Sequence, residues 1–176
     1  MSRVIVALAG LPGTGKSTLA RVLAAHLDGV VLDKDRVRAA LFPPGVLDYS
    51  AAQNDFAMEV VYRTAAFLLE REPARPVILD GRTFSRREQV VRLRIAAEEA
   101  QAPLYLIECT CAPETARRRL EADLTAGAHP AEDRDFALYR RLEAHFDPLP
   151  EPKLVLDTDI PLEICLERAL DYLPHP

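Results

Sequence analysis

The chain has 176 residues, of which 49% are hydrophobic, and its formal net charge is −5. This length supports one domain with its own core, and the negative charge argues against an extended nucleic-acid surface, although a single nucleic-acid end remains open as a substrate. The three cysteines, Cys109, Cys111 and Cys165, have the wrong number and spacing for a zinc site or a disulfide framework, so we expect small buried thiols.

Short apolar segments alternate with segments of helical periodicity along the whole chain. Short apolar strands separated by helices predict an α/β fold with a buried parallel sheet. We expect strands at 4–8, 30–32, 77–79, 104–108 and 154–156, and helices at 17–27, 35–41, 50–69, 85–100, 113–124, 134–146 and 161–173.

The helix expected at 50–69 carries its own start signal and an apolar pattern. Ser50 and Gln53 have the spacing of a capping box, in which side chains at the helix start accept hydrogen bonds from backbone N–H groups. Ala52, Phe56, Val60 and Phe67 mark an apolar face.

The first expected strand runs into the most informative motif of the chain, GLPGTGKST at 10–18. It fits the phosphate-binding loop G-x-x-x-x-G-K-[ST], in which glycines let several backbone N–H groups point into one concavity at a helix start. Lys16 supplies a point charge for the β- and γ-phosphates, and the Ser17 hydroxyl is offered to Mg²⁺. The alternative is a glycine-rich turn beside an exposed lysine. The expected nucleotide-binding residues are Gly10, Leu11, Pro12, Gly13, Thr14, Gly15, Lys16, Ser17 and Thr18.

Two aspartates and an arginine follow the second expected strand, where the carboxyl end of a parallel strand borders the ligand crevice. Asp35 opens a short helix, so its carboxylate is placed to orient an acceptor hydroxyl and take its proton during phosphoryl transfer. Arg38 lies one turn further on and is placed to hold a substrate anion. The alternative for Asp33 or Asp35 is a helix N-cap. We expect Asp33 to be the cap and Asp35 to be the base.

The third expected strand ends in Asp80-Gly81. An acidic residue at the end of the strand beside the phosphate loop is a Walker-B position, which holds Mg²⁺ through a water molecule. The alternative is an Asp–Gly turn that only terminates the strand. Arg82, Arg86 and Arg87 come next and form either a solvated helix start or a wall of the substrate site.

Three consecutive arginines, 117–119, lie on the helix expected after the fourth strand. A break with glycine, histidine and proline and a further helix follow, an order typical of a lid that closes over a transferring phosphate. We expect a lid at approximately 113–146, with Arg119 facing ATP and Arg134 as the second candidate. The other two arginines are expected in solvent ion pairs, and His129 at the surface. After the fifth strand, Asp157 lies either beside the base pocket or at the cap of the last helix.

With these motifs, the chain resembles the phosphate-loop kinases of the zeta-toxin, chloramphenicol phosphotransferase and polynucleotide kinase group. It is most similar to the small bacterial kinase-like proteins called "AAA family ATPases". The resemblance spans nearly the whole chain and rests on GLPGTGKST, DKDRVRAALFP, VILDGRTFSRREQ, RRRLEAD, HPAEDR and LVLDT.

The resemblance implies a P-loop NTPase fold, a three-layer α/β/α arrangement with a five-stranded parallel sheet in the order 2-3-1-4-5. It also implies that Asp35 and Arg38 handle the acceptor hydroxyl. Relatives often carry a second lid arginine four residues after the first, where this chain has Asp123. Arg134 is the residue that we expect to take that place.

Together these observations predict an ATP- and Mg²⁺-dependent kinase that transfers the γ-phosphoryl group to a hydroxyl of a small molecule or to a 5′-hydroxyl nucleic-acid end. One alternative is a regulatory NTPase that hydrolyses ATP without an acceptor, and another is an ATP-binding partner in a toxin–antitoxin complex. No signal peptide precedes the first strand and no apolar run of about 18 residues exists, so we expect a cytoplasmic protein without a membrane partner. The oligomeric state is not predicted.

Overall fold

The strands of the computed structural model, which describes residues 3–126 and 135–174, form one parallel sheet. They are β1 (Ile5–Ala9), β2 (Val30–Asp33), β3 (Val77–Asp80), β4 (Leu104–Thr110) and β5 (Leu154–Asp157). Their order in the sheet is β2-β3-β1-β4-β5, so β1 lies at the centre, with Ile5 opposite Val77 on one side and Leu104 on the other. The fold class and strand order expected from the sequence are confirmed.

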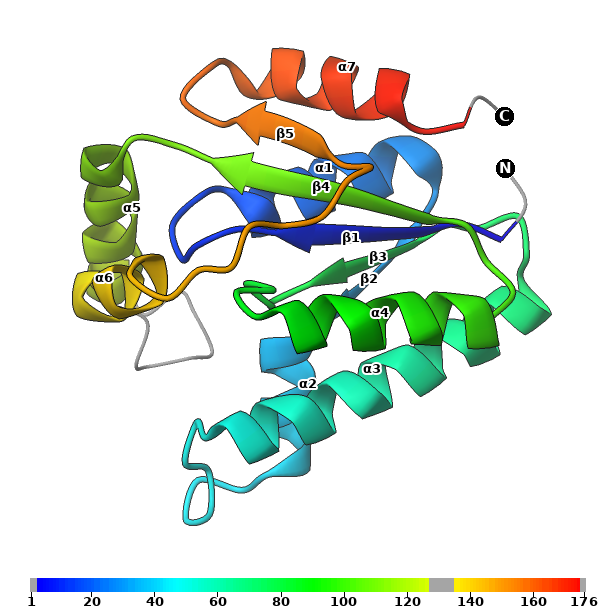
Figure 1. The fold of residues 1–176 in the computed structure, drawn as a ribbon, viewed down its shortest axis with the longest axis horizontal. Helices are drawn as coiled ribbons and strands as arrows, with labels where there is room; N and C mark the ends of the chain where they lie inside the picture. The colour runs from blue at the N-terminus through cyan, green and yellow to red at the C-terminus, as the bar shows by residue number, and fades with distance from the viewer. Residues whose placement is uncertain (1–2, 127–134, 175–176) are drawn as a thin grey trace.

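Helices cover both faces of the sheet and its carboxyl edge (Figure 1). One face carries α1 (Lys16–Leu27) and α7 (Leu162–Tyr172). The other carries α3 (Ala51–Arg71) and α4 (Arg87–Glu99), with α2 (Lys34–Leu41) packed against α3. Beyond the strand ends lie α5 (Pro113–Ala126) and α6 (Phe136–Glu143), which pack on each other.

Side chains of β1 alternate strictly between the two cores. Ile5, Ala7 and Ala9 pack towards α3 and α4, whereas Val6 and Leu8 pack towards α1 and α7. This alternation follows from the two-residue period of a strand, and it makes a strand that is covered on both faces apolar at every position. Both cores therefore hold β1, and the loop that follows it, firmly in place.

The apolar face that the sequence marks on α3 is not the face that the structure buries. Phe56 and Phe67 are 56% and 52% exposed, and the face turned to the core is formed by Ala57, Met58, Val61, Tyr62, Ala65 and Leu69. The helix carries apolar residues on both sides, so its periodicity alone allows more than one phase. The Ser50 cap is confirmed, since its Oγ accepts from the Gln53 N–H at 3.2 Å. The Gln53 side chain instead contacts the loop before the helix, at Val46 and Asp48.

Helices α4 and α6 are shorter than the sequence predicts. Residues 83–86 precede α4 without helical structure, and Phe84 there has a φ of 55°. Helix α6 begins at Phe136, where the Asp135 side chain accepts from the Leu138 N–H at 2.7 Å. None of the described helices combines the length and the apolar character needed to cross a membrane.

The three cysteines are free thiols, as expected. Cys109 in β4 is buried against the α1 core, and burial raises the pKa of its thiol to about 12. Cys111 follows β4 and lies half-buried against the cluster of α5 and α6, rather than on the face that Cys109 shares with α1. Cys165 is buried in α7.

Candidate active site

The phosphate loop turns tightly between the end of β1 and the start of α1. Gly13 has a φ of 79°, and a Cβ atom there would lie 2.8 Å from the Ala116 carbonyl oxygen, so only glycine fits. The Lys16 ammonium donates to the carbonyl oxygens of Gly10 and Leu11, each at 2.7 Å. These two hydrogen bonds hold the ammonium group over the loop that it belongs to, and Lys16 is only 4% exposed.

Two cavities share Lys16 and Ser17 as part of their walls. The first, of about 500 Å³, lies beside α2 and α3 and is lined by Asp35, Arg38 and Arg82 among others; we call it the α2–α3 cavity. The second, of about 700 Å³, surrounds the start of α1; we call it the α1 cavity. Its lining includes Gly13, Gly15, Thr18, Asp33, Asp80, Arg119, Asp123 and Thr158.

Asp33 is the N-cap of α2. Its Oδ1 accepts from the backbone N–H groups of Asp35 at 2.8 Å and Arg36 at 3.4 Å. Burial raises the pKa of Asp33, and the charges of Asp80 and Asp35 add to this effect, while the hydrogen bonds from the cap oppose it. The expectation that Asp33 caps the helix is confirmed.

Asp80 ends β3 directly opposite Asp33 in the parallel register. It is 2% exposed, and within the described part of the chain its Oδ1 has no hydrogen-bond partner. An unsatisfied buried carboxylate oxygen is costly unless a ligand satisfies it. Asp80 and Ser17 line the same cavity, and carboxylate and hydroxyl oxygens are donors that suit Mg²⁺.

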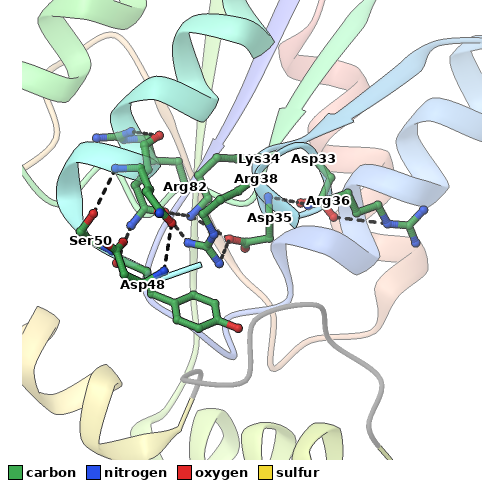
Figure 2. A network of polar contacts seen from close by, with 11 residues as sticks. Asp33, Lys34, Asp35, Arg36, Arg38, Asp48, Ser50 and Arg82 are labelled. Carbon is green, nitrogen blue, oxygen red and sulfur yellow. Dashed lines mark hydrogen bonds and ion pairs between the residues drawn. The ribbon is translucent and has the colours of Figure 1, made fainter. Parts of the chain in front are cut away.

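Asp35 lies between two cations (Figure 2). Its Oδ1 is 2.8 Å from the Lys34 ammonium and 3.2 Å from Nη2 of Arg38. The same two cations also donate to one amide oxygen, Oδ1 of Asn54 on α3. Burial lowers the pKa of Lys34, and the ion pair with Asp35 partly offsets this effect. The sequence motif thus places Asp35 and Arg38 on one wall of the α2–α3 cavity.

Arg82 belongs to the wall of this cavity rather than to a solvated helix start. It is 8% exposed, and its guanidinium donates to the Asp55 carboxylate and, at 3.3 Å, to the Asn54 carbonyl. Arg86 and Arg87 are exposed, although Arg86 also lines the cavity.

Sequence reasoning missed Lys34, Asn54 and Asp55, which line the α2–α3 cavity together with Tyr49. The Tyr49 ring lies 4.5 Å from the Arg38 guanidinium. The only signal for Asn54 and Asp55 was their position near the start of α3, shortly after the Ser50 cap.

Of the three arginines on α5, only Arg119 reaches the phosphate loop. Its Nη1 donates to the Gly13 carbonyl at 3.3 Å, and it also bonds to Thr158 after β5. Arg117 pairs with Glu121 at the surface, and Arg118 is exposed. Arg134 and His129 lie outside the described residues. Asp157 does not cap α7, whose N-cap is Pro161.

The fold is similar to that of several solved structures. A candidate kinase from Chloroflexus aurantiacus J-10-fl is 24% identical, with a TM-score of 0.76 over 99% of this chain and 100% of that chain. The APS kinase CysC of Mycobacterium tuberculosis, in complex with AMPPNP and APS, is 20% identical, with a TM-score of 0.72 over 97% of each chain. A gluconokinase from Sinorhizobium meliloti 1021 is 15% identical, with a TM-score of 0.71 over 97% of this chain and 91% of that chain. At these identities the likeness shows the fold alone.

Comparison with family models gives a match over most of the chain, although no protein with a curated functional description matches it. The matching model describes an AAA domain, AAA_33, and covers residues 5–149. This range includes the phosphate loop, Asp33, Asp35, Asp80 and Arg119. The chain therefore belongs to the AAA domain family AAA_33 and has a P-loop kinase-like fold.

Proposed function

We propose that the protein is an ATP- and Mg²⁺-dependent kinase that transfers the γ-phosphoryl group to a hydroxyl group. The observation that carries this proposal is the meeting of two cavities at Lys16 and Ser17. Phosphoryl transfer requires a donor and an acceptor to approach one phosphate from two sites, with water excluded between them. A regulatory NTPase needs only one of these cavities.

The α1 cavity is the proposed ATP site. Backbone N–H groups of the phosphate loop, Gly10 to Thr18, hold the phosphates at the start of α1. Lys16 leaves the carbonyl oxygens of Gly10 and Leu11 and neutralises the charge that develops on the transferring group. Arg119 lies at the edge of the same cavity, between the phosphate loop and Thr158, and contacts the nucleotide.

Ser17 and Asp80 are the proposed Mg²⁺ residues. The Ser17 hydroxyl and the buried Asp80 carboxylate would hold the metal, Ser17 directly and Asp80 through a water. When bound, Mg²⁺ would supply positive charge that offsets the charge of the phosphates. The unsatisfied Oδ1 of Asp80 supports this assignment.

The α2–α3 cavity is the proposed acceptor site. Asp35 accepts the proton of the acceptor hydroxyl, and the oxygen of that hydroxyl bonds to the γ-phosphorus. The bond between the γ-phosphorus and the β-phosphate oxygen breaks at the same time, which releases ADP. Arg38 orients the acceptor beside it. A cavity of about 500 Å³ favours a small molecule over a 5′-hydroxyl nucleic-acid end.

We assign the whole chain to one kinase domain, with a lid at approximately 113–146 that brings Arg119 and Arg134 over the γ-phosphate. A cytoplasmic setting supplies ATP and Mg²⁺. The gluconokinase and APS kinase folds support a kinase, and the sequence resemblance narrows it to the zeta-toxin, chloramphenicol phosphotransferase and polynucleotide kinase group.

The test is transfer of γ-labelled phosphate from ATP–Mg²⁺ to a panel of sugars, sugar acids, nucleosides, aminoglycosides, chloramphenicol and 5′-hydroxyl oligonucleotides. We expect labelled product from one acceptor class, and its loss in both Lys16→Ala and Asp35→Asn. Arg118→Ala, which removes an exposed charge from α5, is the matched control and retains transfer. Hydrolysis of ATP that no acceptor changes and that Asp35→Asn retains contradicts the kinase proposal and favours a regulatory NTPase.

A further inference from the structure

The α2–α3 cavity contains more buried positive charge than its own carboxylates balance. The side chains of Lys34, Arg38 and Arg82 are 10%, 3% and 9% exposed. Among their ion-pair partners only Asp35 is buried, at 10%, whereas Asp55 is 64% exposed. Three desolvated cations thus face one desolvated carboxylate. Because removing a charge from water is costly, such an excess is stable only where a counter-charge is supplied.

The contacts of these cations leave their charge only partly balanced. Lys34 and Arg38 share one carboxylate, Asp35, and otherwise converge on the neutral amide oxygen of Asn54. Arg82 has the exposed Asp55 as its only carboxylate partner in the described residues. An ion pair with an exposed carboxylate contributes little, because water competes for it. The Nε–H groups of Arg38 and Arg82 have no acceptor in the described residues, so both guanidiniums retain unused donors.

The three cations come from two segments of the chain and line one cavity. Lys34 and Arg38 belong to α2, while Arg82 follows β3 (Figure 2). Arg82 bonds to Asn54 and Asp55 near the start of α3. Arg guanidiniums suit anionic oxygens because their planar donors match carboxylate and phosphate geometry. Asp35, the proposed base, lies within 3.2 Å of Arg38, so an anion held here leaves the rest of a small molecule beside Asp35.

We infer that the acceptor is a small alcohol that also carries an anionic oxygen group, a carboxylate or a phosphoryl group, which Arg82 binds together with Lys34 and Arg38. This inference rests on the proposed kinase function for the acceptor hydroxyl. The anion site itself rests only on the charges of the cavity. The competing explanation is that these cations hold the γ-phosphate of ATP, so the test must keep the nucleotide site filled.

The first experiment measures binding of sulfate by calorimetry in the presence of saturating Mg²⁺ and AMPPNP, at constant ionic strength. We expect one sulfate per chain beside the nucleotide analogue. Arg82→Gln should weaken its Kd at least tenfold, and Asp55→Asn should tighten it about threefold, because the competing carboxylate is removed. Arg87→Gln removes the same charge from an exposed position nearby that does not line the cavity, and should leave the Kd unchanged.

Arg82→Gln should raise the Kd for sulfate and Asp55→Asn should lower it. A variant that merely folds poorly could not bind sulfate more tightly, so the two results together exclude a loss of folding as the explanation. Sulfate that does not bind beside AMPPNP overturns the inference and assigns the cations to the nucleotide. An Asp55→Asn variant that binds sulfate less tightly also overturns it, since Asp55 would then be part of the binding site rather than a competitor.

The second experiment compares phosphoryl transfer to matched pairs of acceptors. Gluconate compared with sorbitol tests whether a carboxylate on the acceptor favours transfer. Glucose 6-phosphate compared with glucose tests the same for a phosphoryl group. We expect at least a tenfold higher kcat/KM for the anionic member of one pair, and a reduced preference in Arg82→Gln. If the neutral and the anionic members of both pairs are phosphorylated with equal kcat/KM, the inference is overturned and the kinase proposal stays intact. Sulfate binding without transfer to any acceptor contradicts the kinase proposal and leaves the anion site intact.

Discussion

Arg119 donates to both oxygens of Thr158, at 2.9 Å from Nη1 to Oγ1 and at 2.8 Å from Nη2 to the carbonyl oxygen. This contact joins α5 to the loop after β5, and a further hydrogen bond from Arg119 reaches Gly13 of the phosphate loop. The guanidinium is thereby fixed where three segments meet at the edge of the α1 cavity. A residue held in this way is preorganised for a ligand of that cavity.

Replacing Arg119 by alanine should weaken nucleotide binding. The change removes a cation from the α1 cavity and separates α5 from Thr158, so we expect the KM for ATP to rise about tenfold, a loss on the order of 1.4 kcal/mol. Arg118→Ala is the control, because Arg118 is exposed on the same helix. Steady-state kinetics at varied ATP concentration give the answer, and equal KM values for the two variants would exclude a nucleotide role for Arg119.

Replacing Asp80 by asparagine should weaken the response to Mg²⁺. The variant keeps the size of the side chain but removes the charge of a buried carboxylate whose Oδ1 has no partner in the described residues. We expect the Mg²⁺ concentration at half-maximal activity to rise about tenfold or more, on the order of 1.4 kcal/mol of lost interaction. Activity is measured against free Mg²⁺ at saturating ATP. An unchanged Mg²⁺ response would instead support a purely strand-terminating Asp–Gly turn.

Replacing Asp33 by asparagine should stabilise the metal-free protein at neutral pH. Burial and the charges of Asp80 and Asp35 raise the pKa of Asp33 above its ordinary 3.8, so the folded state disfavours its charged form. The resulting loss of stability is present above the raised pKa and absent below 3.8. Asparagine caps a helix as well as aspartate does, so the melting temperature in EDTA at pH 7 should rise.

Asp33→Ala provides the control for the cap itself. It removes the same charge but also the acceptor for the Asp35 and Arg36 N–H groups, which costs about 1 kcal/mol. The alanine variant should therefore melt roughly 2–4 °C below the asparagine variant. As the pH falls through the raised pKa, the advantage of asparagine over aspartate should disappear. A melting temperature of Asp33→Asn below that of the unchanged protein at pH 7 would show that the charge stabilises the fold.

Replacing Gly13 by alanine should damage the loop. The new Cβ would lie 2.8 Å from the Ala116 carbonyl oxygen, in a residue with a φ of 79°. We expect a destabilisation of about 1–3 kcal/mol together with weaker ATP binding. Gly45→Ala is the matched control, because nothing lies within 4 Å of a Cβ there, and it should stay within about 0.5 kcal/mol. Denaturant unfolding and ATP titration of both variants check this, and equal losses would contradict the geometric argument.

Much of the fold could be predicted because its signals are local. The strands are apolar at successive positions, since both faces of the sheet are covered, and the spacing of glycines, Lys16 and Ser17 marks one loop. Where a helix carries apolar residues on two faces, the local pattern does not determine which face is buried. In α3, Phe56 and Phe67 mark an apolar face, but the sheet and α4 pack against the neighbouring face that contains Val61 and Leu69.

The candidate site likewise contains some residues that local sequence patterns predict and others that only the fold brings together. The sequence by itself determined the phosphate loop, the Asp33 cap and the Asp35–Arg38 spacing, because each depends on residues within one or two turns of chain. Only the tertiary structure decided that Asn54 and Arg82 join them, across 20 residues from Lys34 to Asn54 and 28 from Asn54 to Arg82. Packing of α2 against α3, which contacts β3, removes Lys34, Arg38 and Arg82 from water. Desolvation, which no local pattern encodes, turns a scattered set of charges into a cavity with an excess of positive charge.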